Sequence, residues 1–352
     1  MNAVMTTTET ISVIVPTYNQ QDSVVYSVNS ILNQTYPVLE VILVDDGSSD
    51  ETGVMVERQK NDSRDWRERV RYIYQPNQGQ SAANNSGIAQ ARGEWIAFNA
   101  SDDLWLPTKL ELQMRALQKF GTKYGFCFSD AWFINNPHMK SSIFESAGKT
   151  TPNTFGTVAN PSRLIALGKH PIWMQTAIAR ADVVRQIGGW DSNLRYFDDY
   201  DLIFRFSRAT AFCFVGIPLV LIDRSPVEES AFGHARDWHK EEFRLRMEQK
   251  CLEKHFMSND ALPNDLRAIF RRNLHNVHKA WANLYIENGD FLRAQESLAT
   301  AATYGASAMQ IAKSVGVRFV PSLLRSTVTR DRRKLVRHDQ LRHLADQNVG
   351  VM

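Results

Sequence analysis

Short runs rich in β-branched residues alternate with helical patterns over the first hundred residues of the chain. Four runs have the length and composition of buried strands: 11–15, 39–44, 72–74 and 94–98. The stretches between them place apolar residues at helical spacing, as Val24, Val28 and Ile31 do. This alternation predicts βαβ units that build a mainly parallel sheet with flanking helices, which is an α/β fold of the Rossmann-like kind.

The pattern changes along the rest of the chain. Further strands are expected near 126–128, 176–179 and 212–221, and a Ser-, Thr-, Gly- and Asn-rich stretch at 140–160 is expected to be a long loop. Three helices are expected beyond residue 236: 236–256, 262–287 and 291–304. The chain is therefore predicted to have two domains, an α/β domain over 1–235 and an all-α extension over 236–352. The last two helices resemble one tetratricopeptide repeat, but no second copy is visible, so a plain helical hairpin is expected.

Three polar clusters fall where predicted strands end or the next helix begins: Asp45–Asp46, Asn77–Asn85 and Ser101–Asp103. In open α/β sheets, ligands bind at this carboxyl edge. The chain has neither a Gly-x-x-x-x-Gly-Lys phosphate loop nor a Gly-x-Gly-x-x-Gly motif after the first strand. A phosphate-bearing ligand would instead be held by carboxylates together with a divalent cation, Mg²⁺ or Mn²⁺, which prefers oxygen ligands.

Composition excludes several classes of protein. The 352 residues carry a net charge of +3. The segment 313–342 alone holds nine basic and two acidic residues, a net +7, so the remainder carries −4. This confinement argues against a nucleic-acid partner and favours either an anionic membrane surface or a charged acceptor, with a solvated basic face as the alternative. No apolar run reaches the roughly 20 residues of a membrane-spanning helix, and no secretory signal is visible.

The cysteines indicate the compartment in which the protein is expected. Cys127, Cys213 and Cys251 are odd in number and far apart, which suits free thiols in a reducing cytosol. A cytoplasmic protein, peripheral on the inner face of the membrane, is therefore expected.

Five sequence blocks resemble the family 2 glycosyltransferases of the GT-A fold, and they occur in family order over about residues 11–225. The blocks are Val13–Asn19, Val44–Thr52, Asn77–Ser81, Gly93–Phe98 with Ser101–Trp105, and Gly188–Asp191 with Asp198–Leu202. The resemblance implies a hexosyltransferase-type enzyme of surface polysaccharide or glycan synthesis. It would transfer a sugar, with inversion, from a nucleoside diphosphate sugar to a hydroxyl of a sugar or glycolipid acceptor.

The resemblance also implies roles for individual residues. Asp199 would be the catalytic base, and Asp102 and Asp103 would bind a divalent cation together with the donor diphosphate. The residues implied in donor binding are Pro16, Tyr18, Asp46, Ser81, Asn84, Ser101 and Asp102. Pro16 and Tyr18 would line the nucleotide base, and Asp46 would accept a hydrogen bond from it.

Each acidic group also has a purely structural interpretation. Asp46 could shape a turn, Asp102 and Asp103 could cap a helix, and 198–201 could be a solvated helix start.

The chain departs from the family pattern at three places. Ala100 replaces the first acid of the Asp-rich motif, Asn84 replaces an Arg, and a His usual after the last strand is absent near Arg224. These departures leave open a second hypothesis, a weakly active or inactive homologue that binds nucleotide sugar or scaffolds partner enzymes. A nucleotidyltransferase is disfavoured because no Gly-rich triphosphate loop precedes the first helix. The sugar, the acceptor and the oligomeric state do not follow from these patterns.

Overall fold

The structure is a computed structural model that describes residues 9–135, 141–148, 154–224, 241–257 and 262–305. The chain divides into two compact units, Met1–His239 and Lys240–Met352. The strands of the first unit are β1 (Ile11–Thr17), β2 (Glu40–Asp45), β3 (Val70–Tyr74), β4 (Trp95–Phe98), β5 (Leu104–Trp105), β6 (Tyr124–Ile134), β7 (Phe155–Val158), β8 (Ala177–Arg180) and β9 (Ala211–Asp223). Its α-helices are α1 (Val24–Leu32), α2 (Thr52–Asp62), α3 (Arg64–Arg69), α4 (Gln80–Gln90), α5 (Lys109–Phe120), α6 (Ile143–Ser146), α7 (Pro161–Ala166), α8 (Ala181–Gln186) and α9 (Asp198–Ala209).

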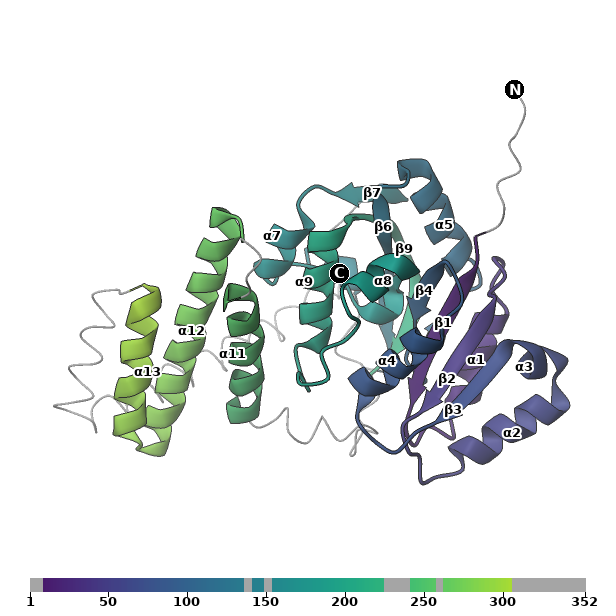
Figure 1. The fold of residues 1–352 in the computed structure, drawn as a ribbon, viewed down its shortest axis with the longest axis horizontal. Coiled ribbons are helices and arrows are strands. Elements are labelled where there is room, and N and C mark those ends of the chain that lie inside the picture. The colour runs from purple at the N-terminus through teal and green to yellow at the C-terminus, as the bar shows by residue number, and fades with distance from the viewer. Residues whose placement is uncertain (1–8, 136–140, 149–153, 225–240, 258–261, 306–352) are drawn as a thin grey trace, which may run out of the picture. The chain divides into compact units, whose positions relative to one another are not determined.

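One sheet organises the first unit (Figure 1). Its strand order is β3-β2-β1-β4-β8-β6-β9-β5, and β7 pairs with β9. The strands from β3 to β4 are parallel, whereas β8 is antiparallel to both of its neighbours, β4 and β6. The expected α/β fold with flanking helices is confirmed, and the sheet is mixed beyond β4.

Helices cover both faces of the parallel strands, as Figure 1 shows. Every residue of β1 is buried, which is typical of a strand covered on both sides. Val13 packs in the same core cluster as Val28 of α1. The next residue, Ile14, faces the opposite way and meets α4 at Gly87, where an added Cβ would come within 2.5 Å of Ile14 Cγ2. Gly87 therefore lets α4 approach the sheet closely, and α4 later proves central to the site.

Two local expectations from the sequence are wrong. The first strand was expected over 11–15, but β1 continues through Pro16 to Thr17, with Pro16 opposite Val44 of β2. On the other side of β1 the pairing with β4 ends at Ile14, so the missing N–H of Pro16 costs the β1–β4 ladder nothing. The 140–160 stretch, expected to be a loop, contains α6 and β7. Ser142 and Glu145 begin α6 with a capping box.

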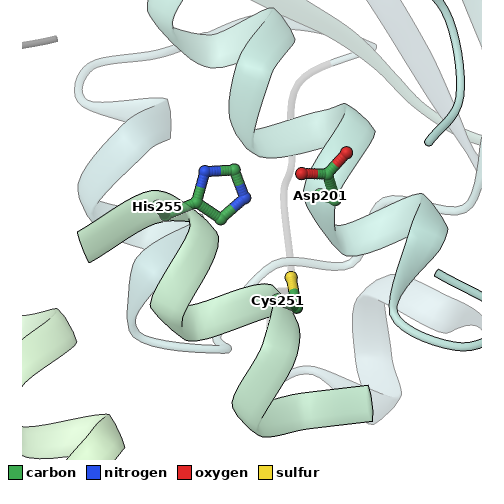
Figure 2. Close-up of side chains that lie close together, drawn as sticks. All are labelled: Asp201, Cys251 and His255. Atoms are coloured by element: carbon green, nitrogen blue, oxygen red, sulfur yellow. The ribbon is translucent and has the colours of Figure 1, made fainter. Parts of the chain in front are cut away.

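The second unit is all-α, as expected, with three described helices: α11 (Glu241–Met257), α12 (Asn264–Asn288) and α13 (Phe291–Tyr304). Gly289 has a left-handed φ of 79° and ends α12, and Asp290 caps α13, so the two helices form a tight hairpin. Cys251 and His255 lie one turn apart on α11 (Figure 2). The ring of His255 is buried and lies 5.7 Å from that of Phe270.

None of the described helices is long and apolar enough to cross a membrane. The predicted basic tail, 313–342, lies outside the described residues, and so does its predicted binding to anionic membranes.

A lysine is buried in the core beneath α5. Lys109 is fully buried, and its Nζ donates to Gln113 Oε1 at 2.9 Å. The same nitrogen lies 3.8 Å from the ring centroid of Trp105. Burial lowers the pKa of Lys109 from 10.5 to about 7, because the charged ammonium loses its hydration. Its position in the first turn of α5, at the positive end of the helix dipole, disfavours the charge further.

We predict that Lys109→Met stabilises the protein at neutral pH. The unfolded chain holds a proton on this lysine up to about pH 10.5, whereas the folded chain releases it near pH 7. Stability of the wild type should therefore rise between these values, and the burial penalty is fully present below pH 7. The variant loses the hydrogen bond from Lys109 to Gln113, and this loss offsets part of the gain. We expect the free energy of unfolding to rise by roughly 1–3 kcal/mol at pH 7, and this increase should vanish by about pH 10.5. Denaturant unfolding across this pH range measures it, and exposed Lys119→Met on the same helix should show no such pH-dependent gain.

Candidate active site

The carboxyl edge of the parallel strands carries a buried carboxylate, Asp46. Its Oδ1 accepts hydrogen bonds from Gln75 Nε2 at 2.8 Å and from the Gln78 amide at 2.9 Å. Its Oδ2 accepts from the Gly79 amide at 2.7 Å. Asp46 thus fixes the loop that leads into α4. Its predicted contact with a nucleotide base remains a prediction, since no surface of the residue is exposed in this structure.

The neighbouring residues of the predicted donor pocket differ in accessibility. Pro16 is buried within β1, whereas Tyr18, just beyond the strand, is only partly buried. Asn84 and Ser101 are buried as well, at 3% and 2% exposure. The Asn84 Oδ1 atom has no hydrogen-bond partner within the described part of the chain. The structure therefore leaves Tyr18 as the accessible group among these four.

Helix α4 fixes the position of the 188–191 loop. Asn85 donates from Nδ2 to the Trp190 carbonyl at 2.9 Å and accepts at Oδ1 from the Trp190 amide at 2.8 Å. Gly189 has a left-handed φ of 65°, and an added Cβ would lie 2.4 Å from Asn85 Oδ1. Only glycine allows this approach without displacing Asn85.

The loop presents Trp190 to Asp199. The indole Nε1 donates to Asp199 Oδ1 at 3.3 Å, and the ring packs edge-on against Phe98 with centroids 4.7 Å apart. One turn earlier on α4, Ser81 donates to Asp198 Oδ2 at 2.6 Å. Two side chains of α4, Ser81 and Asn85, therefore hold the start of α9 and the loop before it.

The three acids at the start of α9 have different partners. Asp198 is bonded to Ser81, and Asp199 to Trp190. Asp201, also on α9 (Figure 2), forms an ion pair with Arg205 at 2.6 Å. Arg205 in turn donates to the Ile187 carbonyl at 2.6 Å. Asp201 therefore holds the helix to the rest of the unit, while Asp198 and Asp199 face α4 and the 188–191 loop.

Asp199 has the electrostatics of a proton acceptor. Burial and the charge of Asp198 raise its pKa to about 7, while the Trp190 donor and the cation of Arg224 lower it. The residue before the helix, Phe197, has a left-handed φ of 61°, which is rare for a bulky side chain. Such strain costs about 1–3 kcal/mol and is found preferentially at functional sites.

A second pair of carboxylates lies in the turn after β4. Asp102 is exposed, whereas Asp103 is buried and its Oδ1 accepts from the Asp223 amide at 2.9 Å. Burial and the charge of Asp102 raise the pKa of Asp103 to about 8. Partial desolvation also raises the pKa of Asp102. Two crowded carboxylates, one of them accessible, fit a divalent cation, which prefers oxygen ligands and would relieve their repulsion.

Arg224 is a site residue that the sequence analysis did not identify. It follows β9 directly, and its backbone amide donates to the Ile134 carbonyl at 3.0 Å. Its guanidinium lies 4.8 Å from the ring centroid of Trp173, a cation–π distance. Arg224 is also close enough to Asp102, Asp103 and Asp199 to lower the pKa of each. The available signal was its place at the end of the last strand, where the family pattern has a histidine.

The site therefore combines a carboxyl group of raised pKa, a crowded carboxylate pair and a cation. A family model described as glycosyl transferase family 2 matches residues 12–181. This region is a family 2 glycosyltransferase domain.

Individual proteins similar to this chain are also named as glycosyltransferases. An uncharacterized glycosyltransferase of Rickettsia bellii is 33% identical over 160 residues, which cover 42% of this chain and 22% of that protein. The matches to five Rickettsia relatives cover between 22% and 60% of the lengths of those proteins.

Two solved structures share the fold at low sequence identity. S. aureus TarS 1–349 in complex with UDP-GlcNAc has a TM-score of 0.55 at 17% identity, covering 84% of this chain and 89% of that one. The Pyrobaculum calidifontis mannosyltransferase PcManGT, in complex with GDP-Man and Mn²⁺, has a TM-score of 0.53 at 19% identity. That match covers 92% of this chain and 85% of the mannosyltransferase.

We predict that Gly189→Ala destabilises this family 2 domain more than Gly188→Ala does. Both glycines have left-handed φ values, 65° and 82°, but nothing lies within 4 Å of a Cβ added at Gly188. Gly188→Ala should cost about 1 kcal/mol from the backbone alone. Gly189→Ala should cost roughly 2–4 kcal/mol, because it also displaces Asn85 from its two hydrogen bonds to Trp190. Denaturant unfolding of both variants tests this, and equal losses would show that the Asn85 contact contributes nothing.

Proposed function

We propose that the protein is an inverting glycosyltransferase that transfers a sugar from a nucleoside diphosphate sugar to an acceptor hydroxyl in glycan synthesis. The observation that carries the proposal is Asp199. A carboxylate with a pKa near 7, held by Trp190, is matched to deprotonating a hydroxyl at neutral pH. The family membership and the carboxylate pair at the same edge of the sheet support this interpretation.

In the proposed reaction, Asp199 accepts the proton of the acceptor hydroxyl. The hydroxyl oxygen forms a bond to the anomeric carbon of the donor sugar as the bond from that carbon to the diphosphate oxygen breaks. The nucleoside diphosphate leaves with the electron pair, and Asp199 later releases its proton to solvent. Attack from the face opposite the diphosphate inverts the anomeric centre.

The leaving diphosphate gathers negative charge that the site must offset. A divalent cation, Mn²⁺ or Mg²⁺, held by Asp102 and Asp103 would neutralise that charge. The Mn²⁺ in the mannosyltransferase complex is consistent with such a requirement. With alanine at position 100, this chain supplies one carboxylate fewer than the usual motif. We therefore propose that Arg224 contributes a second positive charge toward the diphosphate.

The remaining donor contacts are proposed from position. Tyr18 would stack on the nucleotide base, with Pro16 behind it. Asp46 would act mainly by holding the loop before α4, and Asn84 and Ser101 by shaping the buried wall. Ser81, bonded to Asp198, would link the donor side of the site to α9.

Asp199→Asn tests the proposed base. We expect transfer to fall by about 10² or more while donor affinity stays nearly unchanged, because the amide conserves shape but cannot accept the proton. In the wild type, transfer should rise with pH to a plateau above about pH 7, where Asp199 is ionised. Steady-state kinetics over pH 5–9 give both results. Near-normal turnover of the Asn variant would exclude Asp199 as the base, and Asp198 would be examined next.

Arg224→Gln and Asp198→Asn should move the pH profile in opposite directions. Arg224 lowers the pKa of Asp199, so its loss should move the midpoint upward. Asp198 raises that pKa, so its neutralisation should move the midpoint downward. Arg224→Gln should also slow transfer at the plateau, and Arg224→Lys should restore part of the rate. Matching profiles for the two variants would contradict the proposed electrostatics.

A panel of donors identifies the nucleotide and the sugar. Thermal unfolding with UDP, GDP, CMP and dTDP sugars, with and without Mn²⁺, reports affinity through the stabilisation of the folded state. The enzyme should be stabilised by one nucleotide class and should slowly hydrolyse that donor without acceptor. Stabilisation without hydrolysis or transfer would favour a non-catalytic nucleotide-sugar-binding homologue instead.

A further inference from the structure

The helical unit contains a basic groove that the proposed transfer reaction does not use. The groove is a cavity of about 540 Å³ between α12 and the end of α13. Its lining residues are Asn264, Arg267, Ala268, Arg271, Arg272, His275, Tyr304 and Gly305. No acidic residue is among them, and the volume lies in the range of roughly 300–1,000 Å³ usual for small-molecule sites.

Three arginines of the groove have no acidic residue one helical turn away on α12. Arg267, Arg271 and His275 follow one another at i, i+4 and i+8, and Arg272 lies beside them. No residue three or four positions from any of the three arginines is acidic. Like charges at i, i+4 cost an isolated helix about 0.2–0.5 kcal/mol per pair, so the Arg267–Arg271 pair carries repulsion that no acid one helical turn away offsets.

Other arginines of the same unit are paired. Arg244 contacts Glu248 at 3.0 Å, and Arg246 contacts Glu242 at 2.8 Å, each one turn apart. Arg293 lies 3.4 Å from Asp290. The absence of an acid one turn away is therefore a local feature of Arg267, Arg271 and Arg272 and not a general property of the described helices.

Aromatic and backbone contacts hold the groove residues in place. The Arg267 guanidinium lies 5.6 Å from the ring centroid of Phe256, a cation–π distance. Tyr304 packs edge-on against Phe256 and stacks on His278 with centroids 5.7 Å apart. His275 Nδ1 lies 3.0 Å from the Ala301 carbonyl oxygen, so this nitrogen carries the proton. The arrangement orients His275 Nε2 as a second potential donor when the ring is protonated.

One acid near the groove is Glu253 of α11, which acts on Tyr304. Its charge, together with burial, raises the pKa of the Tyr304 hydroxyl, so Tyr304 is a neutral donor at physiological pH. Glu253 itself is engaged by Gln249, whose Nε2 donates to Glu253 Oε1 at 2.8 Å. The lining itself holds three arginines and no acidic residue.

We propose that this groove binds a soluble phosphate-bearing ligand, a phosphomonoester or diphosphate group, through Arg267, Arg271 and Arg272. Guanidinium groups donate paired hydrogen bonds to phosphate oxygens, and three of them match the charge of such a group. The groove is concave, which suits a discrete phosphate group better than a flat membrane surface, and its lining residues Arg271 and Arg272 are exposed to an entering ligand. The helical unit is thereby a second binding module, separate from the sugar-transfer chemistry.

Calorimetric titration of the full chain with inorganic phosphate and with pyrophosphate, at low salt, tests the proposal. The test variant is Arg271→Gln with Arg272→Gln. The matched control is Arg244→Gln with Arg246→Gln, which removes the same charge from paired arginines of α11. All four side chains lie on helix surfaces, and circular dichroism verifies folding. Loss of two charge-assisted hydrogen bonds should weaken binding at the groove at least about tenfold, while the control stays within about twofold of wild type.

Several outcomes overturn the proposal. They are no saturable phosphate binding, equal weakening in both double variants, or arginine-dependent binding to phosphatidylserine vesicles without any binding of soluble phosphate. The substitutions should not affect anions that bind at the carboxyl edge of the sheet. Any binding that the test variant loses is therefore binding at the groove. The test variant should keep wild-type donor hydrolysis, and loss of hydrolysis in both double variants would bear on the proposed transferase activity instead.

Discussion

The two hydrogen bonds between Asn85 and the backbone of Trp190 hold together parts of the site that lie a hundred residues apart in the sequence. Through them, α4 fixes the 188–191 loop, and the loop places the Trp190 indole against Asp199. The pairing depends on a close approach that only glycine at 189 permits. A second close approach, of Gly87 to Ile14, sets α4 against the sheet. The position of the proposed base therefore follows from the packing of one helix.

The acidic residues of the site are held by different partners. Each acid at the start of α9 has its own partner, so Asp201 is neutralised by Arg205 while Asp199 keeps only a weak indole donor. The ionisation of Asp199 is then disfavoured by the charge of Asp198 and favoured by that of Arg224. Arg224 acts on the Asp102–Asp103 pair as well. One cation directly after the last strand thus influences both the proposed proton acceptor and the leaving-group side of the proposed reaction.

Much of the fold could be predicted from periodicity. The strands around 11–15, 39–44 and 94–98, and the helices of the second unit, lie within a few residues of expectation, because buried strands and amphipathic helices have distinct apolar spacing. Predictions from local sequence patterns failed at two places, where contacts or a helix cap outweighed the local preference. Pro16 remains in β1 because β4 has already ended beside it. The Ser- and Gly-rich 140–160 stretch includes α6 because a Ser142–Glu145 capping box begins a helix there. Motifs pointed to Asp46, Asp102, Asp103 and Asp199, whose roles remain predictions, whereas no motif pointed to Arg224.

By itself, the sequence determined the α/β class, the helical extension, the family, and the set of acidic residues at the carboxyl ends of the strands. These follow from local spacing and short motifs, which need no knowledge of distant contacts. Tertiary structure alone decided which carboxylate is buried, which is paired with a cation and which has a raised pKa. It also brought Arg224 beside Asp102, Asp103 and Asp199, and it left the arginines of α12 around a cavity. The physical reason is that a pKa or a charge imbalance depends on desolvation and on neighbours within a few ångströms, and those neighbours are distant in the chain.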